Sequence, residues 1–322
     1  MPPDISIIRE IFKSHLGTNA TSIERFKNGI CHFVFDVVCE NKKKYVIRIA
    51  SESSKDLLTG GLNWNRELER IGVPVPKVIK YDLGGLFSFM ILERLCGTDI
   101  GNIYDDLSIS EKRKIAEEII SIQKKVSSLG KRDKYGYALS FDNLQFNGKN
   151  SWYDVIAENF LRSKDWASGS SLIPPHIFDT AEALFDSLSY VFDDVEAIPF
   201  LDDATTKNLI INDGILIGIV DTDEICFGDC LRTIALTEMS LIASQQNTDY
   251  ATYLKHQLKP DGDWETKYLI YLMGFCVTFL SETNQLFNGN NRYFNNRQYV
   301  NHLLQFFDHI SSKLKLRIRR RQ

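Results

Sequence analysis

Short runs of β-branched and aromatic residues in the first hundred positions predict strands. The clearest pair covers residues 32–39 and 45–50, and the polar stretch Glu40-Asn41-Lys42-Lys43 between them is typical of a hairpin turn. Further on, Val73-Pro74-Val75-Pro76 must be extended, because proline disfavours helix for the residue before it. The other elements expected in this strand-rich part are a helix over 62–71, ending at Gly72, and strands over 78–81 and 87–93.

Beyond Gly97 the apolar positions follow the spacing of helices. Ser108-Ile109-Ser110-Glu111 has the spacing of a capping box, and the isoleucines from 115 to 122 form one apolar stripe with Val126. Further helices are predicted over 152–161, 177–191, 235–244, 264–281 and 299–314, while the basic and apolar residues that alternate over 313–321 are interpreted as a frayed, solvated end. The pattern therefore predicts an α+β protein with a small β-rich part before a larger helical part.

One β-hairpin interrupts the helical part. Residues 209–211 and 215–220 flank Asn212-Asp213-Gly214, and an Asp-Gly pair favours the primed turns of tight hairpins. Because antiparallel strands joined by such a turn bring their outer ends to within about 5 Å, Asn208 and Asp221 are expected to face one another.

The polar residues at the open end of this hairpin indicate phosphoryl transfer. An amide oxygen of Asn208 beside the carboxylate of Asp221 is a ligand pair suited to Mg²⁺. Asp203, on the loop that enters the hairpin, would accept a proton from a hydroxyl group. We add the hypothesis that Lys207 neutralises charge on the transferring phosphoryl group. Taken alone, carboxylates around one turn are more commonly solvated turn residues, so the interpretation depends on the ordered motifs that accompany them.

The composition argues against several other classes of protein. The 322 residues include 38 Lys and Arg against 42 Asp and Glu, and this net charge of −4 does not favour a nucleic-acid partner. Residues 1–13 lack the order of a secretory signal, and the most apolar stretch, 268–280, is shorter than the ~20 residues that span a bilayer. The six cysteines lack paired CxxC spacing. We therefore expect a cytoplasmic protein with reduced thiols that lie in the core and no membrane partner, and the oligomeric state stays open.

The spacing Asp203-x4-Asn208-x12-Asp221 resembles the catalytic and metal-binding loops of the aminoglycoside phosphotransferase and choline kinase-like superfamily, relatives of protein kinases. Other segments match the superfamily in the same order along the chain. They are Tyr45-Val46-Ile47-Arg48-Ile49 as the third strand, Gly72-Val73-Pro74-Val75-Pro76 as the helix-to-strand turn, residues 90–97 as the hinge, and Phe227-Gly228-Asp229 after the metal aspartate.

The resemblance implies a two-lobed protein-kinase-like fold, with a nucleotide-binding lobe over residues 1–95 and a catalytic and acceptor-binding lobe over 96–322. It implies that ATP or GTP, with Mg²⁺, phosphorylates a hydroxyl group of a small acceptor such as an aminoglycoside, an amino alcohol or a sugar. The resemblance implies that Asp203 is the base, and that Asn208 and Asp221 are magnesium ligands with Asp223 assisting through water. It implies that Arg48 and the loop of Asn28 and Gly29 bind the phosphates. Backbone groups of Glu93 and Leu95 would bind adenine.

Arg48 stands where many kinases have the strand lysine that contacts the phosphates, a substitution also common in this superfamily, and three other positions depart from the superfamily pattern. Leu201 stands where a histidine usually precedes the catalytic aspartate, and Thr233 stands where an aspartate follows the FGD stretch. Gly61 falls where a helix glutamate would pair with Arg48, so the partner of Arg48 is open. These departures motivate an alternative function, a non-catalytic nucleotide-binding module of the pseudokinase type.

Overall fold

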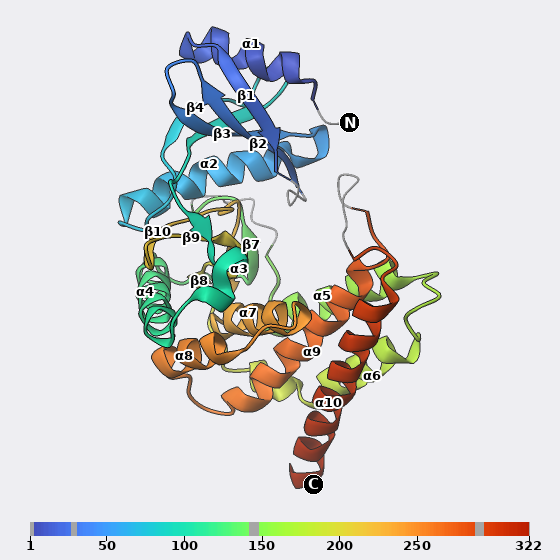
Figure 1. Ribbon diagram of the computed structural model, residues 1–322. Helices are drawn as coiled ribbons and strands as arrows, with labels where there is room; N and C mark the ends of the chain where they lie inside the picture. The colour runs from blue at the N-terminus through green and yellow to red at the C-terminus, as the bar shows by residue number, and fades with distance from the viewer. Residues whose placement is uncertain (1–2, 27–30, 142–147, 287–292, 322) are drawn as a thin grey trace.

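A five-stranded antiparallel sheet forms the first part of the protein (Figure 1). In this computed structural model, which describes residues 3–26, 31–141, 148–286 and 293–321, the strand order is β1-β2-β3-β5-β4. The strands are β1 (Ala20–Arg25), β2 (His32–Cys39), β3 (Lys44–Ala50), β4 (Val78–Asp82) and β5 (Phe89–Glu93). We call the elements from α1 to β5 the sheet lobe and those from β6 to α10 the helical lobe.

Alternate side chains of the sheet bury two different faces. One face, with Ile47 and Ile49 of β3 among its residues, packs against α1 (Ile5–Leu16), and the other packs against α2 (Lys55–Arg70). Figure 1 shows these helices on opposite sides of the sheet, with α2 on the side of the helical lobe. Because successive strand residues point to opposite faces, Arg48 lies on the α2 side. The sheet therefore directs this one arginine toward the helical lobe.

Helix α1 was missed by the sequence analysis, although its sequence carries both helix signals. The Asp4 side chain caps the first turn by accepting a hydrogen bond from the amide of Ser6 at 2.7 Å, and Gly17 ends the helix with a φ of 63°. Ile8 and Phe12 follow at helical spacing and are fully buried against the sheet. The helix covers an apolar sheet face that would otherwise meet water.

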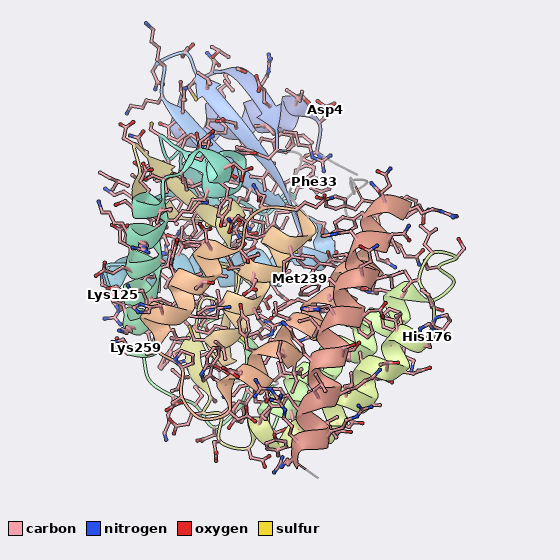
Figure 2. All side chains as sticks on the ribbon, turned by 60° about the horizontal axis from the view of Figure 1, so that its bottom comes forward. Asp4, Phe33, Lys125, His176, Met239 and Lys259 are labelled. Carbon is pink, nitrogen blue, oxygen red and sulfur yellow. The ribbon has the colours of Figure 1, made fainter. Side chains whose placement is uncertain are left out.

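The helical lobe is built on one large hydrophobic core, to which Trp64 and Leu68 of α2 also contribute. Figure 2 shows Met239 of α7 near the centre of the lobe. The helices are α3 (Ile100–Ile103), α4 (Ile109–Ser127), α5 (Trp152–Ala167), α6 (His176–Ser187), α7 (Leu231–Ala243), α8 (Asp249–Leu258), α9 (Trp264–Glu282) and α10 (Arg297–Arg321), with short 3-10 helices at Glu52–Ser54, Tyr104–Asp106, Ser189–Phe192 and Thr206–Asn208. The predicted α+β class, a small sheet part before a larger helical part, is confirmed. The predicted boundary after residue 95 stays a prediction.

Within the described residues of the helical lobe, six short strands position the loops of the site. They form two three-stranded sheets, ordered β10-β9-β6 and β7-β11-β8. Their bounds are β6 (Thr98–Asp99), β7 (Gly136–Ala138), β8 (Ile198–Phe200), β9 (Leu209–Asn212), β10 (Ile215–Ile219) and β11 (Ile225–Gly228). Strands β8 and β11 pair antiparallel, so the chain leaving β8 and the chain entering β11 lie at the same edge. These two chain segments contain residues 201–203 and 221–224.

Local signals read from the sequence are confirmed in two places. The Ser108 amide donates to Glu111 Oε2 at 2.8 Å and the Glu111 amide to Ser108 Oγ at 3.3 Å, which completes the capping box. In the hairpin, Asp213 and Gly214 both have positive φ, at 49° and 72°, as a primed turn requires. All six cysteines are free thiols, but the expectation that they lie in the core is wrong for Cys31 and Cys96, which are exposed.

The expected frayed end is wrong, because α10 continues to Arg321. Arg317 forms ion pairs with Glu265 and, at 3.8 Å, with Asp263, both at the start of α9. The guanidinium of Arg321 lies 3.3 Å from the ring centre of Tyr190. Two basic side chains of this end, Arg317 and Arg321, therefore contact preceding helices, while Lys313, Lys315, Arg319 and Arg320 are exposed, as expected of a solvated end.

Candidate active site

Arg48 joins the sheet lobe to the loop after β10. Its guanidinium donates to both carboxylate oxygens of Asp223, at 2.6 and 2.5 Å, and to Asp221 Oδ1 at 2.9 Å. Burial works against ionisation of Asp223, but the charges and hydrogen bonds of Arg48 and His32 together outweigh it and lower the pKa of this carboxyl. His32 Nε2 lies 3.0 Å from Asp223 Oδ2. The open question about the partner of Arg48 is thus answered by residues that lie about 175 positions further along the chain.

Asp203 lies on the segment between β8 and the 3-10 helix Thr206–Asn208. Its Oδ1 accepts a hydrogen bond from the Thr205 hydroxyl at 3.0 Å, and its Oδ2 lies 3.0 Å from Lys207 Nζ. Burial raises the pKa of Asp203, while Lys207 opposes the shift and the charge of Asp221 adds to it. A carboxylate of raised basicity, one-third exposed, is suited to accept a proton or a hydrogen bond from a substrate hydroxyl.

The orientation of Asn208 is set by two hydrogen bonds. Its side-chain Nδ2 donates to the backbone carbonyl of Asp203 at 2.8 Å, and its backbone carbonyl accepts from the Val220 amide at 2.9 Å. The first bond leaves Oδ1 as the amide atom for a cation, and the second ties Asn208 to the residue before Asp221. An amide oxygen and a half-exposed carboxylate suit Mg²⁺, which takes its other oxygen ligands from phosphates and water. In the described part of the chain, no three His, Cys, Asp or Glu side chains form a group that could hold a metal ion.

The segment before Asp203 is braced from two helices. Gln123 of α4 bonds both polar groups of the Leu201 backbone, and the Thr233 hydroxyl of α7 donates to the Leu201 carbonyl at 2.8 Å. The Leu201 side chain is buried in the core. Leu201 and Thr233, which depart from the superfamily pattern, thus hold the loop through backbone contacts and packing.

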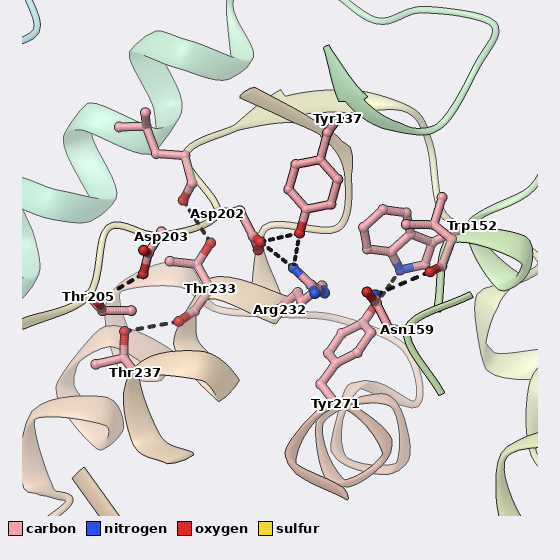
Figure 3. A network of polar contacts seen from close by, with 12 residues as sticks. Tyr137, Trp152, Asn159, Asp202, Asp203, Thr205, Arg232, Thr233, Thr237 and Tyr271 are labelled. Carbon is pink, nitrogen blue, oxygen red and sulfur yellow. Dashed lines mark hydrogen bonds and ion pairs between the residues drawn. The ribbon is translucent and has the colours of Figure 1, made fainter. Parts of the chain in front are cut away.

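Asp202 and Asp203 point in different directions (Figure 3). Asp202 is buried, forms an ion pair with Arg232 of α7, and accepts a hydrogen bond from the Tyr137 hydroxyl at 2.5 Å. Arg232 also donates to the Tyr137 hydroxyl at 2.9 Å. Asp202 is therefore part of the support of the loop, and Asp203 is the carboxylate that faces the site.

A cavity of about 180 Å³ lies between the two lobes at these loops. It is lined by Cys31 and Leu57 of the sheet lobe and by Tyr137, residues 201–204 and residues 219–224 of the helical lobe. Asp203, Asp221 and Asp223 therefore share one cavity. The predicted phosphate loop, with Asn28 and Gly29, lies outside the described residues and directly precedes Cys31.

The hinge segment follows β5. The Glu93 amide donates to the Lys77 carbonyl at 2.9 Å, and the Leu95 carbonyl accepts from Arg94 at 3.0 Å and from the Gly97 amide at 3.1 Å. The Leu95 side chain fills the space beside Gly218 of β10, where a Cβ would lie 2.4 Å from Leu95 Cδ1. The hinge thus packs on the hairpin that carries Asn208 and Asp221.

Two glutamates near Asp203 were missed by the sequence analysis. Burial raises the pKa of Glu224 to about 7, with the charges of Asp223 and Asp202 adding to the shift. Burial likewise raises the pKa of Glu282, at the end of α9, to about 7, although the charges of Lys207 and Arg162 oppose it. Glu224 adjoins the DxD stretch and could have been suspected, but nothing in the sequence connects Glu282 with Asp203.

Comparisons with known proteins bear on this architecture. None of the family models scanned matches the sequence, and no curated protein matches it. Among solved structures, the chain is similar to a thermostable mutant of aminoglycoside phosphotransferase APH(4)-Ia, with a TM-score of 0.67 and 13% identity over 95% of this chain and 98% of that chain. It is also similar to the streptomycin–ATP–APH(2″)-IIa complex, with a TM-score of 0.61 and 16% identity over 95% of this chain and 97% of that chain.

A third similar structure is a putative fructosamine-3-kinase from Thermobifida fusca, with a TM-score of 0.60 and 11% identity over 94% of this chain and all of that chain. The chain therefore has the two-lobed, protein-kinase-like fold of the aminoglycoside phosphotransferases, as the resemblance implied. Within the described ranges, no helix is long and apolar enough to cross a membrane.

Proposed function

We propose that this protein is a small-molecule kinase that transfers the γ-phosphoryl group of ATP, or GTP, to a hydroxyl group of its acceptor. The observation that carries the proposal is the single cavity that holds Asp203 and Asp221, with Arg48 bonded to Asp221 at 2.9 Å. On this proposal, Asp203 as the base and Asp221 as a magnesium ligand line one cavity, and Arg48, the cation for the phosphates, is bonded to Asp221 from outside that lining. The fold supports the same function, because it is shared with kinases of small molecules.

The chemistry assigns a role to each group. Asp203 accepts the proton of the acceptor hydroxyl while the oxygen of that hydroxyl forms a bond to the γ-phosphorus. The bond from the γ-phosphorus to the β–γ bridging oxygen breaks, and the nucleoside diphosphate leaves. Lys207, which lies against Asp203, neutralises charge that builds on the phosphoryl oxygens. Asn208 and Asp221 would hold Mg²⁺, which supplies charge neutralisation on the nucleotide phosphates. Arg48 and the loop of Asn28 and Gly29 would bind the phosphates, and backbone groups of Glu93 and Leu95 would bind adenine.

The acceptor is proposed to carry an amino group as well as a hydroxyl. Glu224 lines the same cavity as Asp203, and the charge of Asp203 acts on Glu282. A bound ammonium group would stabilise the charged forms of both glutamates. Aminoglycosides, amino alcohols and amino sugars all meet this description. A neutral sugar meets only half of it.

The test is nucleotide turnover with a panel of aminoglycosides, amino alcohols, amino sugars and neutral sugars, with and without Mg²⁺. We expect Mg²⁺-dependent phosphorylation of an amine-bearing acceptor, and Asp203→Asn should lower kcat by about 10²–10⁴-fold with nucleotide binding retained. Asp213→Asn is the matched control, because Asp213 lies at the far end of the same hairpin. If nucleotide binds but no acceptor is phosphorylated, the alternative of a pseudokinase-like binding module is favoured instead.

A further inference from the structure

The ion pair between Arg48 and Asp223 joins the two lobes. Arg48 is 7% exposed and lies on β3, while the Asp223 side chain is 12% exposed and lies on the loop between β10 and β11. Both carboxylate oxygens of Asp223 accept from the guanidinium, which is the bidentate geometry that arginine forms best. The imidazole of His32, also buried, contacts Asp223 Oδ2. A charged pair this deeply buried constrains the position of the arginine.

Helix α2 has a notch that admits Asp223. Gly60 and Gly61 are consecutive in the helix interior, where each glycine costs about 1 kcal/mol relative to alanine. A Cβ at Gly61 would lie 2.3 Å from Asp223 Oδ1, and a Cβ at Gly60 would lie 2.6 Å from the Asp223 carbonyl oxygen. The two glycines therefore leave the space that Asp223 occupies. This space accounts for the presence of two glycines in the interior of the helix.

In protein kinases the basic residue of the third strand pairs with a glutamate of this helix, within one lobe. Here the helix position carries no side chain, and a carboxylate from the other lobe fills the space instead. We propose that Asp223, seated in the Gly60–Gly61 notch, is the positioning residue that holds Arg48 for the nucleotide phosphates. This inference rests on the proposed function, and it gives Asp223 a role other than that of a magnesium ligand.

The two aspartates that contact Arg48 differ in a way that fits this division. Asp223 is buried and makes two hydrogen bonds to the guanidinium, whereas Asp221 makes one and its side chain is 52% exposed. The contact with Asp221 is the one that solvent and a cation can reach. Asp223 therefore stays with Arg48 when Asp221 takes up its role on the nucleotide.

The test moves the carboxylate from position 223 to the helix. In Asp223→Ala we expect the dissociation constant for Mg²⁺·ATP, measured by calorimetry, to rise at least tenfold. Adding Gly61→Asp should restore it to within about threefold of the wild type, because a Cβ at position 61 lies 3.7 Å from Arg48 Nη1 and its carboxylate can reach that nitrogen. Asp223→Ala with Gly61→Ala is the matched control, which fills the notch without a charge and should restore nothing.

Two further measurements make the outcome decisive. In an Arg48→Met background, Asp223→Ala should leave the dissociation constant unchanged, because it acts through Arg48. The Mg²⁺ concentration for half-maximal nucleotide binding should be the same in the wild type and in the relocated variant. Circular dichroism and thermal unfolding identify any variant that fails to fold, and Asp223→Asn, which keeps the volume of the side chain, then replaces Asp223→Ala in the comparison with the wild type.

The inference is overturned if Asp223→Ala, or its Asn replacement, binds Mg²⁺·ATP as the wild type does. It is also overturned if the folded relocated variant is no tighter than its alanine control, or if loss of Asp223 acts on the Mg²⁺ requirement, as a metal ligand would. A wild-type protein that binds no nucleotide would contradict the proposed function itself, so the two failures are distinguishable.

Discussion

The side chain of Gln123 bonds the backbone of Leu201 through both of its polar atoms. Its Nε2 donates to the Leu201 carbonyl at 2.8 Å, and its Oε1 accepts from the Leu201 amide at 2.9 Å. Both groups are buried, and Leu201 lies two residues before Asp203. A glutamine on the long helix α4 thus sets the path of the chain that carries the proposed base.

Gln123→Leu should destabilise this protein and weaken catalysis together. The Leu201 carbonyl keeps Thr233 as a donor, but the Leu201 amide loses its acceptor, and a buried unsatisfied amide costs about 1–3 kcal/mol. We expect that loss in the free energy of unfolding, measured by urea titration, with a lower kcat. Gln246→Leu is the control, since that amide makes a single exposed contact of 3.4 Å, and it should change stability by less than about 0.5 kcal/mol. Equal effects of the two substitutions would contradict the bracing role.

Lys207→Ala should lower kcat by about 10–100-fold and leave the nucleotide KM within about threefold, because a charge that acts on the transferring group matters most in the transition state. Its ion pair with Asp203 is partly exposed, so the thermal midpoint should hardly change. Lys207→Arg should recover part of the loss. Lys164→Ala, which breaks surface ion pairs with Asp179 and Glu182, serves as the control. Turnover that survives in Lys207→Ala would remove Lys207 from the mechanism.

Glu282→Gln should change how stability depends on pH. Burial raises the pKa of the Glu282 carboxyl from 4.5 to about 7, so the folded state binds more protons than the unfolded state between these values. The contribution of this carboxyl to stability is therefore full below its ordinary pKa and is lost as the pH rises through about 7. Between about pH 5 and pH 8, the free energy of unfolding should fall by about 1–3 kcal/mol more in the wild type than in Glu282→Gln.

Urea titrations at four pH values across that range measure this difference. Glu117→Gln, on an exposed face of α4, should retain the wild-type pH dependence. A Glu282→Gln curve parallel to that of the wild type would show that Glu282 is not held in an environment that disfavours its charge.

The contacts made within one short segment could be predicted from the sequence. The turn at Asp213-Gly214 and the pairing of β9 with β10 follow from local conformational preferences. The register shifts between Leu216 and Gly218 and the partner of Asn208 is Val220, so the expectation that Asn208 faces Asp221 is corrected by one residue. The capping box at Ser108 and most helices of the second part follow in the same way. The order of motifs along the chain indicated the kinase-like fold, which the solved structures confirm.

The sequence by itself determined which local elements form, since turns, caps and amphipathic faces depend on residues a few positions apart. Only the tertiary structure decided which charges meet, because Arg48 and Asp223 come together through the packing of two lobes and not through any local spacing. The tertiary structure also decided what Gly61 does. In the sequence, Gly61 stands where the glutamate partner of Arg48 is missing, whereas in three dimensions it leaves the space that the carboxylate of Asp223 fills.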